Sequence, residues 1–132
     1  MITEATKKAL IQAACDVREH AYAPYSNYKV GAAILAGDGR IFTGVNVENA
    51  SYGLSICAER SAISKAISEG IRKILAVAIC TVNVGSPCGA CRQVMVEFAG
   101  DMPVWLTDTQ GNMHETTLHT LIPEYFGPGH LT

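Results

Sequence analysis

The sequence predicts an α/β fold, a three-layer α/β/α sandwich built on a mixed five-stranded sheet. Three observations favour this class. Segments of strand-like composition alternate along the chain with segments of helical periodicity. The pair Asp38-Gly39 is a turn signal between two β-rich runs, which predicts that the first two strands form a hairpin. The apolar run Ile74–Cys80 is typical of a buried strand.

The first third of the chain is expected to form one helix followed by the hairpin. Residues 3–21 are rich in helix formers with apolar positions near helical spacing, and Thr3 is a suitable N-cap. Pro24 would end that helix. The two hairpin strands are predicted at Tyr28–Leu35 and Ile41–Asn49.

Two more helices and two more strands complete the predicted fold. Residues 57–70 carry one apolar stripe at helical spacing, with Ser55 as a candidate cap and Gly70 as a stop. After the buried strand, a helix is expected from about Pro87 to Phe98, with Ser86 as its cap. The run PVWLTD and a short return strand after the TQGN turn follow.

Composition indicates one globular domain spanning residues 1–132. The hydrophobic fraction is 48%, and the net charge of −2 gives no basic track for a nucleic acid. No apolar stretch approaches the length of a membrane-spanning helix, and the N-terminal residues lack the apolar segment of a secretory signal. We therefore expect a cytoplasmic protein that acts on neither membranes nor nucleic acids.

The chain contains five cysteines, which we expect to stay reduced in a cytosol. Cys15 and Cys80 fit small buried hydrophobic positions. Cys88 and Cys91 form a Cys-x-x-Cys pair at a predicted helix start, where backbone N–H groups favour thiolates. A thioredoxin-like redox pair is the competing interpretation, but Cys57 stands at a second predicted helix start.

Three thiolates at one point predict a catalytic zinc site, because tetrahedral zinc with three protein ligands keeps one position for water. A structural site would need a fourth cysteine at regular spacing. Glu59, two residues after Cys57, is poorly placed as a ligand but suits a general base for the bound water. Arg60 shares the face of Cys57 and would offset the negative charge of the thiolates, and Arg92 could assist.

The strings CAER and PCGACRQ together resemble the signature of zinc-dependent deaminases, usually written H-x-E…P-C-x-x-C, with cysteine replacing histidine. With YSNYKVGAA, NVENASYG and Phe126-Gly127, the chain resembles the small homotetrameric cytidine deaminases. The resemblance implies one Zn²⁺ per subunit, a small nucleoside substrate, and hydrolysis of cytidine and 2′-deoxycytidine to the uridine products with release of ammonia, as in pyrimidine salvage. Glu59 would shuttle the protons.

The resemblance also implies substrate contacts within one chain. Tyr28 would stack on the base, where relatives usually have Phe. The backbone N–H of Ala58 and the carbonyl of Ser86 would bind the pyrimidine edge and the leaving amine. Asn46 and Glu48 would bind the ribose hydroxyls, and as alternate residues of a predicted strand they are expected to project from one face.

Three further positions are implied to act between subunits. Ala50 and Tyr52 correspond to residues that reach a neighbouring site, and Phe126 corresponds to an aromatic residue that closes over the pyrimidine of an adjacent chain. Each active site of the homotetramer would then be shared.

Three alternatives remain open at this stage. A blasticidin-S-type deaminase would share the zinc site, but the Asn-x-Glu-Asn sequence at Asn46–Asn49 favours cytidine. A deaminase that edits cytosine in RNA or DNA is disfavoured by the charge balance. A zinc-stabilised binding module without chemistry would use Glu59 only for stability.

Overall fold

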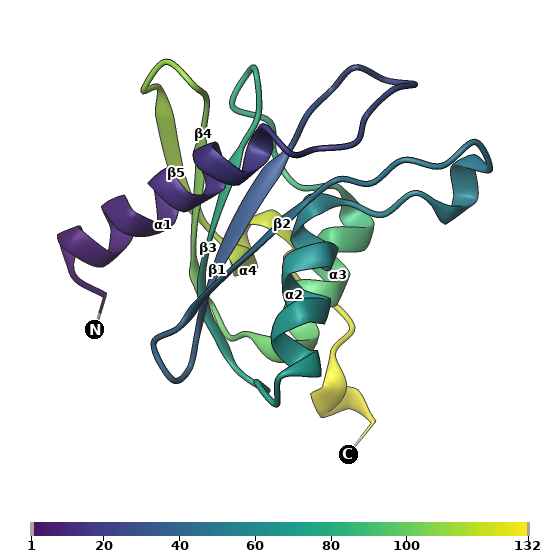
Figure 1. Ribbon diagram of the computed structural model, residues 1–132. Helices are drawn as coiled ribbons and strands as arrows, with labels where there is room; N and C mark the ends of the chain where they lie inside the picture. Colours follow the sequence, from purple (N-terminus) through teal and green to yellow (C-terminus); the bar gives the residue numbers. More distant parts are fainter. Residues whose placement is uncertain (1, 132) are drawn as a thin grey trace.

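Five strands form one mixed sheet in the computed structural model, which describes residues 2–131 (Figure 1). Their order is β2-β1-β3-β4-β5. β1 (Gly31–Ala36) pairs antiparallel with both β2 (Ile41–Val45) and β3 (Ile74–Cys80). β4 (Pro103–Thr107) lies parallel to β3, and β5 (Met113–Thr117) returns antiparallel along β4. The predicted mixed five-stranded sheet is confirmed.

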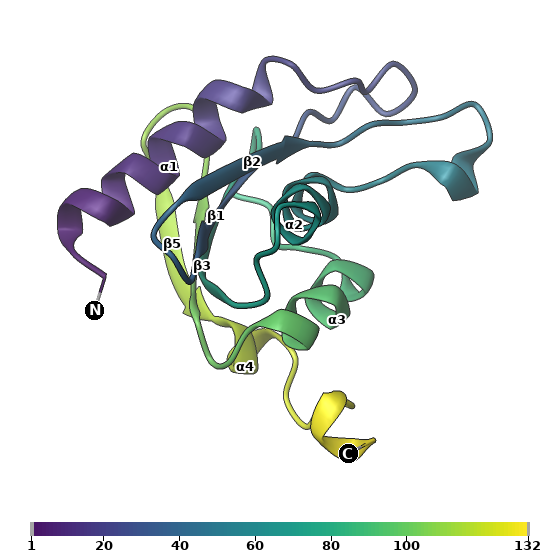
Figure 2. The same ribbon diagram turned by 60° about the horizontal axis from the view of Figure 1, so that its bottom comes forward.

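Helices cover both faces of this sheet (Figure 2). α1 (Glu4–Arg18) lies on one face, whereas α2 (Ala58–Ser68) and α3 (Gly89–Phe98) lie on the other. The short helix α4 (Leu118–Leu121) follows β5. The α/β class and its three layers are therefore as predicted. Two 3-10 turns lie outside the layers, η1 (Tyr52–Leu54) and η2 (Pro128–His130).

The two faces of the sheet carry different side chains because successive strand residues point to opposite sides. Ala76 and Ala78 of β3 face α1 together with Trp105, in a cluster of mostly small residues. Val77 and Ile79 belong to the larger cluster beneath α2 and α3. β3 thus contributes small side chains to the cluster beneath α1 and larger side chains to the main core beneath α2 and α3.

Two glycines let helices approach the sheet closely. A Cβ atom at Gly31 would lie 2.1 Å from the carbonyl oxygen of Ala14 in α1. A Cβ atom at Gly44 in β2 would lie 2.4 Å from the backbone nitrogen of Ala62 and 2.7 Å from the carbonyl oxygen of Ala58. Gly44 therefore sets the distance between β2 and the first turns of α2.

The helix starts differ from those predicted at two places. Thr3 caps α1 as expected, because its Oγ1 accepts a hydrogen bond from the Thr6 N–H at 3.1 Å. Cys57 and Cys88, however, are the N-caps of α2 and α3 in place of the predicted serines. The Ser55 hydroxyl instead accepts from the Asn49 N–H, and the Ser86 hydroxyl accepts from the Arg92 guanidinium. Both serines are engaged in loop contacts.

The hairpin strands are also shorter than predicted. At the end of the hairpin away from its turn, the Asn46 side chain makes hydrogen bonds to the residues just before β1. Its Oδ1 accepts from the Val30 N–H at 2.9 Å. Its Nδ2 donates to the Tyr28 carbonyl at 2.8 Å. The amide thus replaces the regular ladder, and the chain beyond Val45 leaves the sheet. The segment from Asn46 to Ile56 then projects from the body of the molecule (Figure 1).

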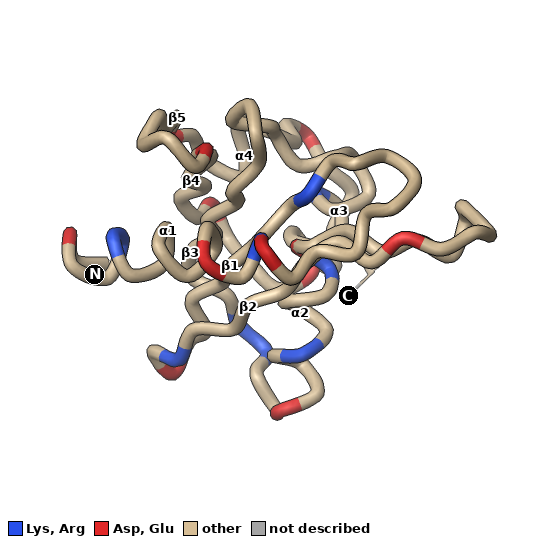
Figure 3. The backbone as a smooth tube through the Cα atoms, turned by 45° about the horizontal axis from the view of Figure 1, so that its top comes forward, with Lys and Arg blue, Asp and Glu red and all other residues tan. Residues whose placement is uncertain are grey.

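Acidic and basic residues are interspersed along the backbone (Figure 3). No helix within residues 2–131 combines the length and apolar character required to cross a bilayer.

Candidate active site

The structure brings the three clustered cysteines together. Their sulfur atoms all lie within 4.8 Å of one another. The Sγ atoms of Cys57 and Cys88 are 3.9 Å apart, and those of Cys88 and Cys91 are 3.4 Å apart. Cys57 immediately precedes α2, Cys88 precedes α3, and Cys91 lies in the first turn of α3. Two helix N-termini therefore meet at one sulfur cluster, as the sequence predicted.

The donor set fits a zinc ion. Tetrahedral zinc with Zn–S bonds of about 2.3 Å places its sulfur ligands roughly 3.8 Å apart. The observed separations lie close to that value. Both helix N-termini also direct partial positive charge toward the sulfurs, which favours the thiolate form that ligation requires.

Charged neighbours act on the same sulfurs. Hydrogen bonding from Cys91, and then from Arg60 and Cys88, lowers the pKa of the Cys57 thiol to about 5. The pairing with Cys57 and burial raise the pKa of Cys91. The Arg60 Nη2 atom lies 3.9 Å from the Cys57 sulfur, which agrees with the expected charge compensation.

Arg92 does not take the assisting part that its position beside Cys91 suggested. Its guanidinium donates hydrogen bonds to the carbonyl oxygens of Pro87 and Leu121 and to the Ser86 hydroxyl. These contacts tie α3 to the loop before it and to the end of α4. Its donors are therefore used to hold the loop that carries Cys88.

Glu59 is buried in the first turn of α2, with 4% of its surface exposed. Burial is the main cause that raises its pKa, to about 7. A carboxyl group with a pKa near neutrality can both accept and donate a proton at physiological pH. Glu59 has this property and lines the same cavity as Cys57 and Cys88.

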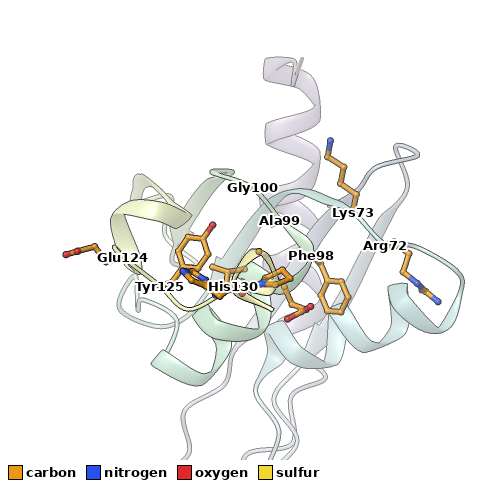
Figure 4. Close-up of a pocket in the computed structure, with 13 residues that line it drawn as sticks. Arg72, Lys73, Phe98, Ala99, Gly100, Glu124, Tyr125 and His130 are labelled. Carbon is orange, nitrogen blue, oxygen red and sulfur yellow. Dashed lines mark hydrogen bonds between the residues drawn. The ribbon is translucent and has the colours of Figure 1, made fainter. Parts of the chain in front are cut away.

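That cavity has a volume of about 290 Å³, close to the lower end of the range for small-molecule sites. Its lining includes all five residues expected to contact substrate within one chain, namely Tyr28, Asn46, Glu48, Ala58 and Ser86. A larger hollow of about 830 Å³ lies between the end of α3 and the C-terminal tail, beside Phe98, Tyr125 and His130 (Figure 4). None of the predicted site residues lines that larger hollow.

Asn46 and Glu48 reach the cavity by a different route from the one predicted. They do not project from a strand face, because β2 ends at Val45. Glu48 Oε1 accepts from the backbone N–H groups of Tyr25 and Ser26, and Oε2 accepts from the Ser26 hydroxyl. A carboxylate has about four acceptor sites, so Oε2 keeps one for a ligand. The Asn46 amide likewise makes two of its four possible hydrogen bonds.

Tyr28 is half-buried at the cavity wall. Its hydroxyl donates a hydrogen bond to Asn83 Oδ1 at 2.7 Å. This polar contact is absent from a Phe at the same place.

Ala50, Tyr52 and Phe126 do not line the cavity of their own chain. Tyr52 lies in η1 on the projecting segment and is 75% exposed, with an edge-on contact to the Tyr25 ring at 5.8 Å between centroids. Phe126 lies in the C-terminal tail, is 58% exposed and stacks on His130.

Sequence reasoning missed Ser26, Thr81 and Asn83. Ser26 holds Glu48 across 22 positions, and Asn83 meets Tyr28 across 55. Each is an ordinary loop residue with no periodic pattern around it. Only the hydrogen bonding of the folded chain shows their connection to the site.

A cavity lined by Cys57, Cys88 and the buried Glu59, with Cys91 behind it in the same sulfur cluster, has the parts of a zinc-dependent hydrolase. The chain belongs to the cytidine and deoxycytidylate deaminase family, because residues 4–107 match the model of that family's zinc-binding region.

Similar proteins agree with this assignment. A cytidine deaminase from Sporosarcina psychrophila is 50% identical over 120 residues, which cover 89% of this chain and 88% of the relative. One from Halalkalibacterium halodurans is 49% identical over 123 residues, covering 91% and 93%. The crystal structure of cytidine deaminase from Burkholderia pseudomallei superposes with a TM-score of 0.85 at 50% identity, covering 90% of this chain and 98% of that one.

Proposed function

We propose that this chain catalyses the hydrolysis of cytidine and 2′-deoxycytidine to uridine and 2′-deoxyuridine, with one water consumed and one ammonia released. The observation that carries the proposal is a cavity of about 290 Å³ lined by the buried Glu59 and by two of the three converging thiols, those of Cys57 and Cys88. The similarity to cytidine deaminases at about half identity over most of the chain supports the same substrate. It disfavours a blasticidin-S-type activity.

The chain's own residues account for the proton transfers. When bound by Cys57, Cys88 and Cys91, zinc supplies the Lewis acidity that makes an attacking water more acidic. Glu59 accepts the proton of that water and delivers it to ring N3 as the C4–O bond forms. Glu59 then takes the remaining proton of the hydroxyl group on C4 and passes it to the exocyclic nitrogen, and ammonia leaves as the C4–N bond breaks and the C4 carbonyl forms.

Other residues would orient the nucleoside. Ala58 and Ser86 both line the cavity, where the Ala58 N–H and the Ser86 carbonyl would bind the edge of the base and Tyr28 would stack on its ring. Asn46 and Glu48 offer the hydrogen-bonding capacity left over from their loop contacts to the sugar hydroxyls. Arg60 tempers the charge of the sulfur ligands.

The proposed assembly is a homotetramer in which each site is completed by neighbouring subunits. The support is the exposure of Tyr52 and Phe126, neither of which lines the nucleoside cavity of its own chain. Residues 1–132 would form one catalytic domain of this assembly. The three thiols would have to stay reduced to bind metal, which suits the cytoplasm.

The proposal is tested by incubating the purified protein with cytidine and following the ultraviolet change that accompanies conversion to uridine. Activity should disappear when a chelator removes zinc and return when zinc is restored, with metal content measured alongside. A zinc-loaded protein that leaves cytidine and 2′-deoxycytidine unchanged would refute the proposed activity.

A further inference from the structure

The loop between β3 and α3 contains a strained residue. Val84 has a φ of 57°, in the left-handed region that a β-branched residue rarely adopts. Such a conformation persists only where the surrounding structure holds it. The loop carries Ser86 and leads directly to Cys88, so its shape affects both the base position and the sulfur cluster.

Besides the Arg92 contacts already described and a longer bond of 3.4 Å from the Thr81 hydroxyl to Asn83 Oδ1, two hydrogen bonds bear on the position of Tyr28. The Gly85 N–H donates to Thr81 Oγ1 at 2.6 Å and closes the loop on itself. The second bond is external, because the Tyr28 hydroxyl donates to Asn83 Oδ1 at 2.7 Å. The loop is therefore joined to an aromatic side chain that arises on the other side of the cavity, immediately before β1.

The absence of a side chain at Gly85 leaves room for the Tyr28 hydroxyl. A Cβ atom at Gly85 would lie 2.3 Å from that hydroxyl oxygen and 3.2 Å from Thr81 Oγ1. Any side chain there would push the ring away or break its bond to Asn83. The pair formed by a tyrosine at 28 and a glycine at 85 is thus sterically matched.

We propose that Asn83 and Gly85 are positioning residues, which hold the Tyr28 ring at one angle in the nucleoside cavity and couple it to the loop that presents Ser86. The inference rests on the proposed function of this cavity. Asn83 is exposed and does not line the cavity, so it acts through Tyr28. Gly85 lines the cavity wall but has no side chain to offer a ligand.

The first test is a double-mutant cycle on Tyr28 and Asn83, with KM and kcat for cytidine as readouts. Asn83→Ala should raise KM roughly fivefold, as expected for loss of one hydrogen bond, with kcat changed less. Asn83→Asp keeps an acceptor for the tyrosine hydroxyl and should restore most of the KM. In the Tyr28→Phe background, Asn83→Ala should have much less further effect, because only the longer 3.4 Å contact from the Thr81 hydroxyl is left to lose.

The second test uses the steric match. Gly85→Ala should raise KM more than Asn83→Ala does, since it displaces the ring itself. Combined with Tyr28→Phe, which removes the opposing oxygen, the same substitution should become much milder. Val82→Ala, in the same loop but at an exposed valine outside the contacts described, is the matched control and should leave KM unchanged.

Thermal melting and zinc content accompany each variant, so that a change in KM is not confused with unfolding or metal loss. If Gly85→Ala does not fold, the Asn83 variants decide the matter. Additive effects of Tyr28→Phe and Asn83→Ala, or no rescue by Asn83→Asp, overturn the inference while an active parent protein leaves the deaminase function intact. A parent protein without cytidine turnover overturns both.

Discussion

The sulfur end of the cavity and its outer rim are built in different ways. At the sulfur end, Cys57, Cys88 and Glu59 stand in or beside the first turns of α2 and α3, which pack on the main core. The residues proposed to form this rim for a neighbouring subunit are Tyr52, on the projecting segment, and Phe126, in the tail, and both are largely exposed. One chain therefore assembles the groups proposed for the chemistry, whereas the aromatic groups proposed to enclose the substrate are exposed and do not line the cavity of their own chain.

The two parts of the site differ in the contacts that fix the positions of their side chains. Gly44 allows the first turns of α2 to lie against β2, so the position of Glu59 is fixed by backbone packing. No comparable contact fixes Tyr52, whose ring meets only the Tyr25 ring among the aromatic contacts of residues 2–131. The sulfur end should thus tolerate change poorly in every context, and the rim should depend on neighbouring subunits.

The largest effect is expected at the sulfur end from Cys88→Ala. Losing one of three thiolates should reduce zinc to well below one ion per chain and bring cytidine turnover below detection. Metal analysis and the ultraviolet assay measure the two quantities. Cys15→Ala, at a cysteine remote from the cluster, is the control and should keep both. Full activity in a zinc-depleted Cys88→Ala protein would contradict the assignment.

Glu59→Gln should be next in size. The amide keeps the shape of the buried side chain but cannot carry the proton, so kcat should fall by roughly 10²–10⁴-fold. Zinc content and melting temperature should stay near those of the parent protein. A variant that turns over cytidine at the parental rate would reduce Glu59 to a residue of structural importance only.

The rim is tested by Phe126→Ala, which should lower kcat/KM by about 10–100-fold through loss of an aromatic contact with the base. Mixing subunits of Phe126→Ala and Glu59→Gln tests whether Phe126 serves the site of a neighbouring subunit. In mixed assemblies, a chain with an intact Glu59 receives Phe126 from its neighbour, so activity should exceed the sum of the two separate variants. Activity equal to that sum would show that Phe126 does not serve a neighbouring site.

Arg60→Gln should have a milder effect, since the guanidinium acts through the Cys57 sulfur. About a tenfold fall in kcat with zinc retained is expected for a neighbour that tunes a metal ligand. Arg60→Lys keeps the charge with fewer donors and should fall between Arg60→Gln and the parent protein. An unchanged kcat in Arg60→Gln would contradict the proposal that Arg60 compensates the charge of the sulfur ligands.

The smallest effect concerns the Glu48 loop and its pH dependence. Hydrogen bonds from Ser26, through both its hydroxyl and its backbone, and from the Tyr25 backbone lower the pKa of Glu48 from 4.5. The folded state thus favours the charged form, so this stabilisation is present above pH ~4.5 and is lost as the pH falls through the lower folded value. Melting curves of the parent and Glu48→Gln should differ most near neutral pH and converge in acid. A constant difference would contradict this.

The sequence predicted regular elements and the sulfur cluster well because both depend on local patterns. The run Ile74–Cys80 is a buried strand with the predicted bounds, and the spacing of Cys88 and Cys91 placed both thiols at one helix start. The caps were wrong because Ser55 and Ser86 bond to residues that composition does not associate with them. Contacts between distant loops, such as that of Tyr28 with Asn83, follow only from the three-dimensional path of the chain.

The all-sulfur donor set also affects which metal ions can compete for the site. Thiolates are soft ligands that bind copper(I) as well as zinc, so the ligand type alone does not exclude copper(I) from the site. Loading with zinc then depends on a low concentration of free copper(I) around the protein. Copper(I) bound there would lie at the sulfur end of the nucleoside cavity, which Cys57 and Cys88 line, so added copper(I) should inactivate the protein.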